Sequence, residues 1–277
     1  MRFKIIRILK NIPIVNKIYP KLLEILDGHY YKTHCANYTI IPFGSYCLPR
    51  VITTLAMLKP KKRWGEKTCP LDLCFALDFS KNTELLDSHF SPLWDDIEYR
   101  VDRKVWCNKK FNITFNHEVN ISLEELKSIV NRRVENLYNY INDKSKHLYF
   151  VIGTSKFIDD FISYHKGVMD YVTQEKIERF IEVVKKYRNV EDFDVIFINQ
   201  TDKQIKCNLK NVHVIDLIND KDFENINTHD WVLELQKQKR KEAKRFYRKL
   251  SKELRNIIQI KWTFILSQLS NICVLEL

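Results

Sequence analysis

The chain has 277 residues, a formal net charge of +11 and a hydrophobic fraction of 45%. Such a composition is typical of a globular protein and excludes a disordered chain. Only 5 glycines and 7 prolines leave little room for long flexible linkers, and no apolar run reaches the roughly 18–20 residues of a membrane-spanning helix.

The positive charge is concentrated at the two ends of the chain. Residues 1–21 carry six Lys or Arg and no acidic residue, whereas residues 236–255 carry ten Lys or Arg against two Glu. Residues 1–27 mix apolar and basic side chains as an interfacial helix does, although a helix packed on the core would show the same pattern. We therefore expect residues 1–27 and 236–277 to contact an anionic membrane surface. The rest of the chain is close to neutral, so nucleic-acid binding is not expected.

The seven cysteines follow neither a disulfide framework nor a zinc-binding spacing. The first residues lack the uninterrupted apolar stretch and the small-residue cleavage site of a signal peptide. These features predict reduced cysteines, no bound metal, no cofactor and a cytoplasmic protein on the inner face of the membrane. Neither G-x-G-x-x-G nor a P-loop pattern occurs, which weighs against dinucleotide binding.

The first predicted elements form a strand, a tight turn and a helix. Residues 38–41 are β-branched and aromatic, Gly44 and Ser45 predict a turn, and residues 51–58 predict a helix. Residues 59–79 are expected to form a loop that enters a short element. This opening is typical of an α/β protein.

The second half of the chain alternates helices with strands. Helices are predicted at 122–141, where Ser122 and Glu125 have capping-box spacing, and at 173–188, with Thr173 as N-cap. Strands are predicted at 147–153, 194–200 and 212–217. The alternation predicts a three-layer α/β fold, in which a mostly parallel sheet has helices on both faces. We expect a basic N-terminal segment (1–35), a core domain (36–227) and a basic helical C-terminal segment (228–277).

Cys47 is the cysteine best placed for chemistry. It follows a strand and a glycine turn and directly precedes a helix, with Pro49 in the first helical turn. A thiol at a helix start is close to the positive end of the helix dipole, which lowers its pKa, and to backbone N–H groups that can hold an oxyanion. An inert buried cysteine is the alternative. Ser45 is a second candidate nucleophile in the same turn.

Five further residues are candidates around this nucleophile. His117 lies near an element end, where it could act as a general base, and Glu118 or Asp72 could orient its ring. Asp72 is an acid among apolar residues, so it needs a partner, and an arginine is the alternative to His117. Arg132 and Arg133, on the 122–141 helix, could bind phosphate or carboxylate, or be solvated.

Taken together, these segments resemble a bacterial family of papain-like cysteine peptidases whose genes often accompany polysaccharide and glycosyltransferase genes. The resemblance lies in four short blocks over about residues 38–200: Gly44, Ser45 and Cys47; Pro70 and Asp72; Phe115, His117 and Glu118; and Arg132 and Arg133. The third residue after Pro70 is Leu73, where the family has tryptophan. The resemblance implies Cys47 as nucleophile and His117 as base, and a papain-like α+β fold as the alternative to the α/β fold that the periodicity predicts.

The resulting hypothesis is a cysteine-dependent hydrolase or acyl transferase of cell-surface polysaccharide synthesis, with a glycan or peptide-like substrate. Gly44, Ser45, Glu118, Arg132 and Arg133 would bind the substrate. A sugar- or phosphate-transferring enzyme of the same pathway is the first alternative. The second is a non-enzymatic module that binds membrane or nucleic acid through its basic tail.

Overall fold

The computed structural model describes residues 25, 27–44, 46–155, 171–201, 203–217 and 240–258, without the side chains of Ser155 and of residues 240–244. Asn37–Ile258 forms one compact unit, and a second unit combines Met1–Ala36 with Gln259–Leu277. In the second unit, residues 27–34 are helical. The interfacial helical segment predicted over residues 1–27 lies outside the described residues except for 25 and 27, as does the boundary predicted at residues 227 and 228.

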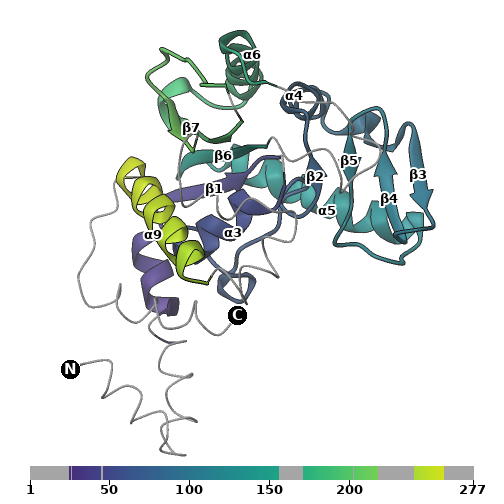
Figure 1. Cartoon of the computed structure of the whole chain (residues 1–277), viewed down its shortest axis with the longest axis horizontal. Coiled ribbons are helices and arrows are strands. Elements are labelled where there is room, and N and C mark those ends of the chain that lie inside the picture. Colours follow the sequence, from purple (N-terminus) through teal and green to yellow (C-terminus); the bar gives the residue numbers. More distant parts are fainter. Residues whose placement is uncertain are drawn as a thin grey trace, which may run out of the picture. The chain divides into compact units, whose positions relative to one another are not determined.

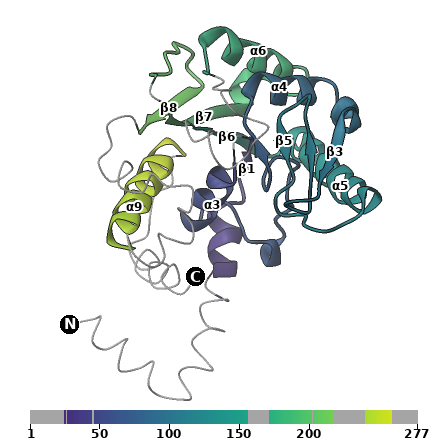
Figure 2. The same cartoon turned by 45° about the vertical axis from the view of Figure 1, so that its right-hand side comes forward.

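The unit Asn37–Ile258 is built on a parallel sheet, so the predicted α/β class is confirmed. Among the described residues this sheet has four strands in the order β1-β6-β7-β8 (Figures 1 and 2). The strands are β1 (Tyr38–Pro42), β6 (His147–Ser155), β7 (Phe193–Gln200) and β8 (Val212–Asp216). Each strand lies within two residues of its predicted bounds.

The helices follow the signals read from the sequence. α5 (Leu123–Asn142) begins with a capping box in which Ser122 Oγ accepts from Glu125 N, and Thr173 Oγ1 caps α6 (Gln174–Lys185). The remaining described α-helices of this unit are α3 (Leu48–Leu55), α4 (Phe79–Asp87) and α9 (Arg240–Ile257). Within the described part of the chain, no helix combines the length and the apolar character needed to cross a bilayer.

A second, antiparallel sheet follows α3 in the chain and begins within residues 59–79, where a loop entering a short element was expected. Its order is β2-β5-β4-β3, from β2 (Phe75–Ala76), β3 (Ile97–Arg100), β4 (Val105–Asn108) and β5 (Ile113–Thr114). The expectation of a mostly parallel sheet thus holds for the first sheet alone. Strands of two to four residues are too short to show a period of two, so the sequence pattern does not reveal them.

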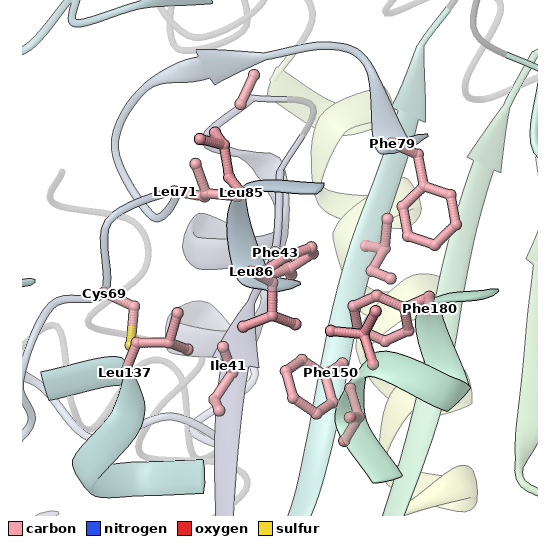
Figure 3. Packing of buried hydrophobic residues seen from close by; sticks show 14 of the residues in the cluster. Ile41, Phe43, Cys69, Leu71, Phe79, Leu85, Leu86, Leu137, Phe150 and Phe180 are labelled. Atoms are coloured by element: carbon pink, nitrogen blue, oxygen red, sulfur yellow. The ribbon is translucent and has the colours of Figure 1, made fainter. Parts of the chain in front are cut away.

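The main hydrophobic core lies on the face of the parallel sheet that α6 covers (Figure 3). The ring of Phe180 in α6 lies 5.2 Å from those of Phe43 and Phe150 and 5.4 Å from that of Phe79 in α4. The core continues to α5 through Leu137 (Figure 3). This aromatic cluster fixes the end of β1 and therefore the turn that follows it.

The opposite face of the parallel sheet is buried as well. Phe150 and Val151 are consecutive in β6 and point to opposite faces, yet both are fully buried. α3 contacts β1 and β6, and α9 contacts α3 and β8. The helix that follows Cys47 thus packs on strands of the parallel sheet.

The order of the described parallel strands follows their order in the chain, without a reversal. In open α/β sheets, the crevice at the carboxyl ends opens where the order reverses. The described strands therefore do not form such a crevice beside the Gly44–Cys47 turn. A site at this position depends on the side chains that the turn and its neighbours bring together.

Candidate functional site

Cys47 lies where the sequence predicts it, between the carboxyl end of β1 and the start of α3. It is the N-cap residue of α3, its carbonyl oxygen accepts from Val51 N at 2.9 Å, and a proline occupies the first turn. The helix begins at Leu48, three residues before the predicted start. The four-residue turn between β1 and Cys47 therefore sets the position of the thiol.

Gly44 makes this turn possible. Its φ of +84° is in the left-handed region, and a Cβ added to it would lie 2.4 Å from Asn82 Nδ2 and 3.2 Å from the carbonyl oxygen of Ala76. Asn82, in α4, donates from Nδ2 to the same Ala76 oxygen at 2.8 Å. The turn is thus packed directly against α4 and β2. Ser45 lies outside the described residues.

The Cys47 thiol is half-buried, and burial raises its pKa. We expected the start of the helix to lower that pKa, but the loss of hydration outweighs the effect of the nearby backbone. The thiol is therefore neutral at pH 7 in this structure. Nucleophilic attack by Cys47 would require a base to remove its proton.

Two tyrosines interact electrostatically with Cys47, and no pattern in the sequence indicated either of them. The Tyr46 hydroxyl donates to Gln200 Oε1 at the carboxyl end of β7. Burial raises the pKa of Tyr46, and the nearby Cys47 and Tyr247 raise it further. Burial and Cys47 also raise the pKa of Tyr247, which comes from α9. Both phenols are therefore protonated around neutral pH and able to donate hydrogen bonds.

Gln200 is held in place by a polar network across the carboxyl ends of the parallel strands. Its backbone N donates to Thr154 Oγ1 at 3.2 Å, and that hydroxyl donates to Asn199 Oδ1 at 2.8 Å. Asn199 Nδ2 in turn donates to Asp216 Oδ1 at 2.6 Å. The partner of the Tyr46 hydroxyl is thus tied to β6 and β8.

Asp72 belongs to a buried charge cluster with Arg50, Lys59 and Glu66. Arg50 Nη1 donates to Asp72 Oδ2 at 2.8 Å, and Arg50 Nη2 donates to Glu66 Oε2 at 2.9 Å. Lys59 Nζ lies 3.0 Å from Glu66 Oε1 and donates to the carbonyl oxygen of Ile40 in β1. Burial raises the pKa of the Asp72 carboxyl even though Lys59 and Arg50 act to lower it. Of the two partners considered for Asp72, the structure shows arginine.

His117 follows β5 and its side chain is exposed. Within the described residues it makes no hydrogen bond or ion pair, either with Cys47 or with Asp72. This arrangement does not bring the three residues predicted to act in catalysis into one hydrogen-bonded group. A base role for His117 would need a change on substrate binding.

Glu118 and Arg133, by contrast, are brought together. Both are buried, and Arg133 Nη2 donates to Glu118 Oε1. In the described structure Glu118 Oε2 and Arg133 Nη1 have no hydrogen-bond partner. Both side chains interact electrostatically with Cys74, as does Cys47. The neighbouring Arg132 is exposed on α5.

One residue from each of the four blocks noted in the sequence thus interacts electrostatically with Cys74: Cys47, Asp72, Glu118 and Arg133. The comparisons with known proteins add nothing to this geometry. No protein-family model, curated protein or solved structure matches the chain.

In the described residues, no group of three or more His, Cys, Asp or Glu side chains could hold a metal ion.

The residues that the sequence did not single out share one property. These residues are Arg50, Lys59, Glu66, Tyr46 and Tyr247. Each interacts with a side chain or carbonyl group outside its own helix or strand. Arg50 is three residues after Cys47, on a short and otherwise largely apolar helix, which is the one local signal that could have indicated a buried charge.

Proposed function

We propose that the protein is a cysteine-dependent acyl-transfer enzyme, a hydrolase or an acyl transferase, of cell-surface polysaccharide synthesis. The observation that carries the proposal is the position of Cys47, at the N-cap of α3 and the carboxyl end of β1, near two half-buried tyrosines. The family resemblance supports the link to polysaccharide synthesis and a glycan or peptide-like substrate.

In the proposed reaction, Cys47 Sγ attacks a carbonyl carbon and its proton passes to a base, for which we propose His117. Backbone N–H groups at the start of α3 hold the oxyanion. The leaving group takes the proton from the base as the thioester forms, and water or an acceptor hydroxyl then releases the acyl group. Asp72 acts on this site by holding Arg50, and therefore α3, in place. The substrate binds against Gly44, with Ser45 as a further contact.

The test uses a simple activated ester, p-nitrophenyl acetate, on the full chain. We expect release of p-nitrophenolate together with an acetyl group on Cys47, located by peptide mass spectrometry. Because the resting thiol is neutral, His117→Ala should slow acylation about 100-fold or more. Cys47→Ser is the control for labelling elsewhere. Acetylation spread over several cysteines, with no preference for Cys47, would contradict the proposal.

A second candidate, a sugar- or phosphate-transferring enzyme, is favoured by Arg133 and Glu118. Arg133 Nη1 and Glu118 Oε2 are a buried donor and a buried acceptor without protein partners in the described structure. Such a pair suits a hydroxyl or phosphate group, and the exposed Arg132 adds charge nearby in the chain. This function needs no thiol, so nucleotide-sugar binding to protein alkylated at Cys47 would support it over acyl transfer.

We also propose that the protein lies on the cytoplasmic face of an anionic membrane, contacting it through residues 1–27 and 236–277. Within residues 236–277 the structure describes residues 240–258, which contain α9. The exposed side chains of α9 include Arg245, Arg248, Lys249 and Lys252. A non-enzymatic membrane-binding module would use the same face. Binding to nucleic acid is not part of the proposal.

Finally, we propose that the parallel sheet is the middle of three layers. The burial of consecutive residues such as Phe150 and Val151 supports it, as do the contacts of α3 with β1 and β6. Phe180 places α6 on the face that carries Phe150. A three-layer core leaves the carboxyl ends of the strands, and with them Cys47, at the rim of the sheet.

A further inference from the structure

The turn between β1 and Cys47 is attached to several other parts of the fold. At its start, Phe43 N donates to the carbonyl oxygen of Val151 in β6 at 2.9 Å. In its middle, Gly44 packs against α4. At its end, Tyr46 reaches the parallel sheet with its side chain, and Tyr46 is the residue directly before Cys47. The attachment of Tyr46 is therefore the one closest in the chain to the thiol.

Gln200, the partner of Tyr46, has a firmly held backbone. It is the last residue of β7 and is 3% exposed. Its backbone N donates to Thr154 Oγ1 in β6 at 3.2 Å. The next residue, Thr201, is also buried, and its N and Oγ1 donate to Asn199 Oδ1 at 3.2 and 2.8 Å. The backbone on both sides of the Gln200 side chain is therefore fixed at the carboxyl end of the sheet.

The bond between Tyr46 and Gln200 has a defined direction and is stable toward pH. The amide oxygen Oε1 of Gln200 can only accept, so the Tyr46 hydroxyl is the donor. Burial raises the pKa of Tyr46, which keeps this hydroxyl protonated at neutral and mildly alkaline pH. The bond spans 154 residues of the chain and attaches the residue before Cys47 to β7.

We propose that Gln200 is a positioning residue of the Cys47 site, which holds the thiol in its half-buried place by accepting the hydrogen bond of Tyr46. The proposal rests on Cys47 as the nucleophile. Without the bond, the turn is freer, so the thiol meets solvent more often and faces the backbone N–H groups at the start of α3 less often. The bond should therefore slow general thiol chemistry at Cys47 and speed acyl transfer.

The experiment compares two reactions of Cys47 in the full chain, alkylation by iodoacetamide and acetylation by p-nitrophenyl acetate, both located by peptide mass spectrometry. In Gln200→Met, which keeps the side-chain length without the amide, we expect alkylation near pH 7.5 to be about fivefold faster, as the loss of one hydrogen bond shifts an equilibrium. The apparent pKa of Cys47 should fall toward the ordinary value of about 8.5, because the thiol is better hydrated. Acetylation should be about tenfold slower, since it requires the thiol in one place.

Tyr46→Phe removes the other half of the bond and should change both reactions in the same directions. In the double variant, Tyr46→Phe with Gln200→Met, Cys47 should be alkylated no faster than in either single variant, because all three lack the same bond. Tyr138→Phe is the matched control. It removes a phenol hydroxyl that donates to the carbonyl oxygen of Leu86 at 2.7 Å, and it should leave both reactions of Cys47 unchanged.

A purely structural role of the bond predicts a different pattern. The variants would then unfold at lower urea concentration, but both rates at Cys47 would be unchanged in the folded protein, and this result would overturn the proposal. Effects that multiply in the double variant would overturn it as well, since they would show that Tyr46 and Gln200 act separately.

The buried Cys69, Cys74 and Cys107 report whether each variant is folded, because they stay protected from iodoacetamide in the native structure. If one single variant does not fold, the other gives the same test. The alkylation rates judge Gln200 whether or not Cys47 is acetylated. The absence of an acetyl adduct on wild-type Cys47 would contradict the acyl-transfer function separately.

Discussion

Gly44 shows how one residue controls the position of the candidate nucleophile. Its left-handed φ turns the chain from β1 toward α3, and its missing side chain leaves room for Asn82. Both requirements come from the fold around the turn. The sequence indicated the turn but not the contact with α4, because that contact depends on where α4 packs.

Gly44→Ala should therefore destabilise the protein more than a comparable substitution in an open turn. Gly65 has nearly the same φ, +85°, with nothing within 4 Å of an added Cβ. We expect Gly65→Ala to lower the free energy of unfolding by about 1–2 kcal/mol from backbone strain. Gly44→Ala should cost about 1–3 kcal/mol more through overpacking. Chemical denaturation of both variants measures the difference, and equal losses would mean that Asn82 moves aside without cost.

At the same scale, the position of Cys47 could be predicted from the sequence, whereas the pKa of its thiol could not. Its place before a helix follows from the strand, the glycine turn and Pro49, which are adjacent in the chain. Its raised pKa follows from burial, which the sequence around it does not show. The protonation state of a residue is set by its surroundings in space.

At the scale of the elements, the buried charges attach the long loop after α3 to the helix itself. Arg50 lies on α3, and Lys59, Glu66 and Asp72 lie on the segment that follows it. Lys59 also reaches the Ile40 carbonyl oxygen, which connects the cluster to β1. The cluster thus fixes α3 relative to the sheet and supports the Cys47 turn.

Asp72→Asn should be strongly destabilising, since it leaves Arg50 and Lys59 with one buried carboxylate between them. We expect a loss of about 3–5 kcal/mol in the free energy of unfolding, measured by urea denaturation. Asp102→Asn is the control, because Asp102 pairs with Arg100 while 57% exposed, and should change stability by less than about 1 kcal/mol. A catalytic Asp72 without this structural role would instead give a variant as stable as the wild type.

At the scale of the whole molecule, the basic residues of α9 are separated from its apolar ones. Phe246, Leu250 and Leu254 are buried, whereas Arg248 and Lys252 are exposed. Because the apolar stripe is already packed within the protein, α9 would meet a membrane through charge and not through insertion of its apolar face.

Reversing two exposed charges tests this surface. Arg248→Glu with Lys252→Glu should weaken binding to vesicles that contain phosphatidylserine by about tenfold or more, since each basic residue near the surface contributes about 1 kcal/mol. The binding of the wild type should also weaken as salt is raised. Lys144→Glu with Lys185→Glu, exposed on other parts of the chain, makes the same change in net charge. Equal weakening by both pairs would show that net charge, and not α9, directs the protein to the membrane.

The sequence by itself determined the elements whose signals are local. The capping box of Ser122 and Glu125, the Thr173 cap and the apolar strands all depend on residues within one element, and the α/β class follows from their alternation. The short strands of the antiparallel sheet carried no such signal.

Tertiary structure alone decided which side chains meet. Asp72 finds Arg50 across 22 residues, Tyr46 finds Gln200 across 154, and Arg255 reaches Ala56 across 199. Local patterns fix the backbone because caps and hydrophobic periodicity act over a few residues. The partner of a buried charge or a phenol depends instead on how distant elements pack, and the neighbours of Cys47 are determined in this way.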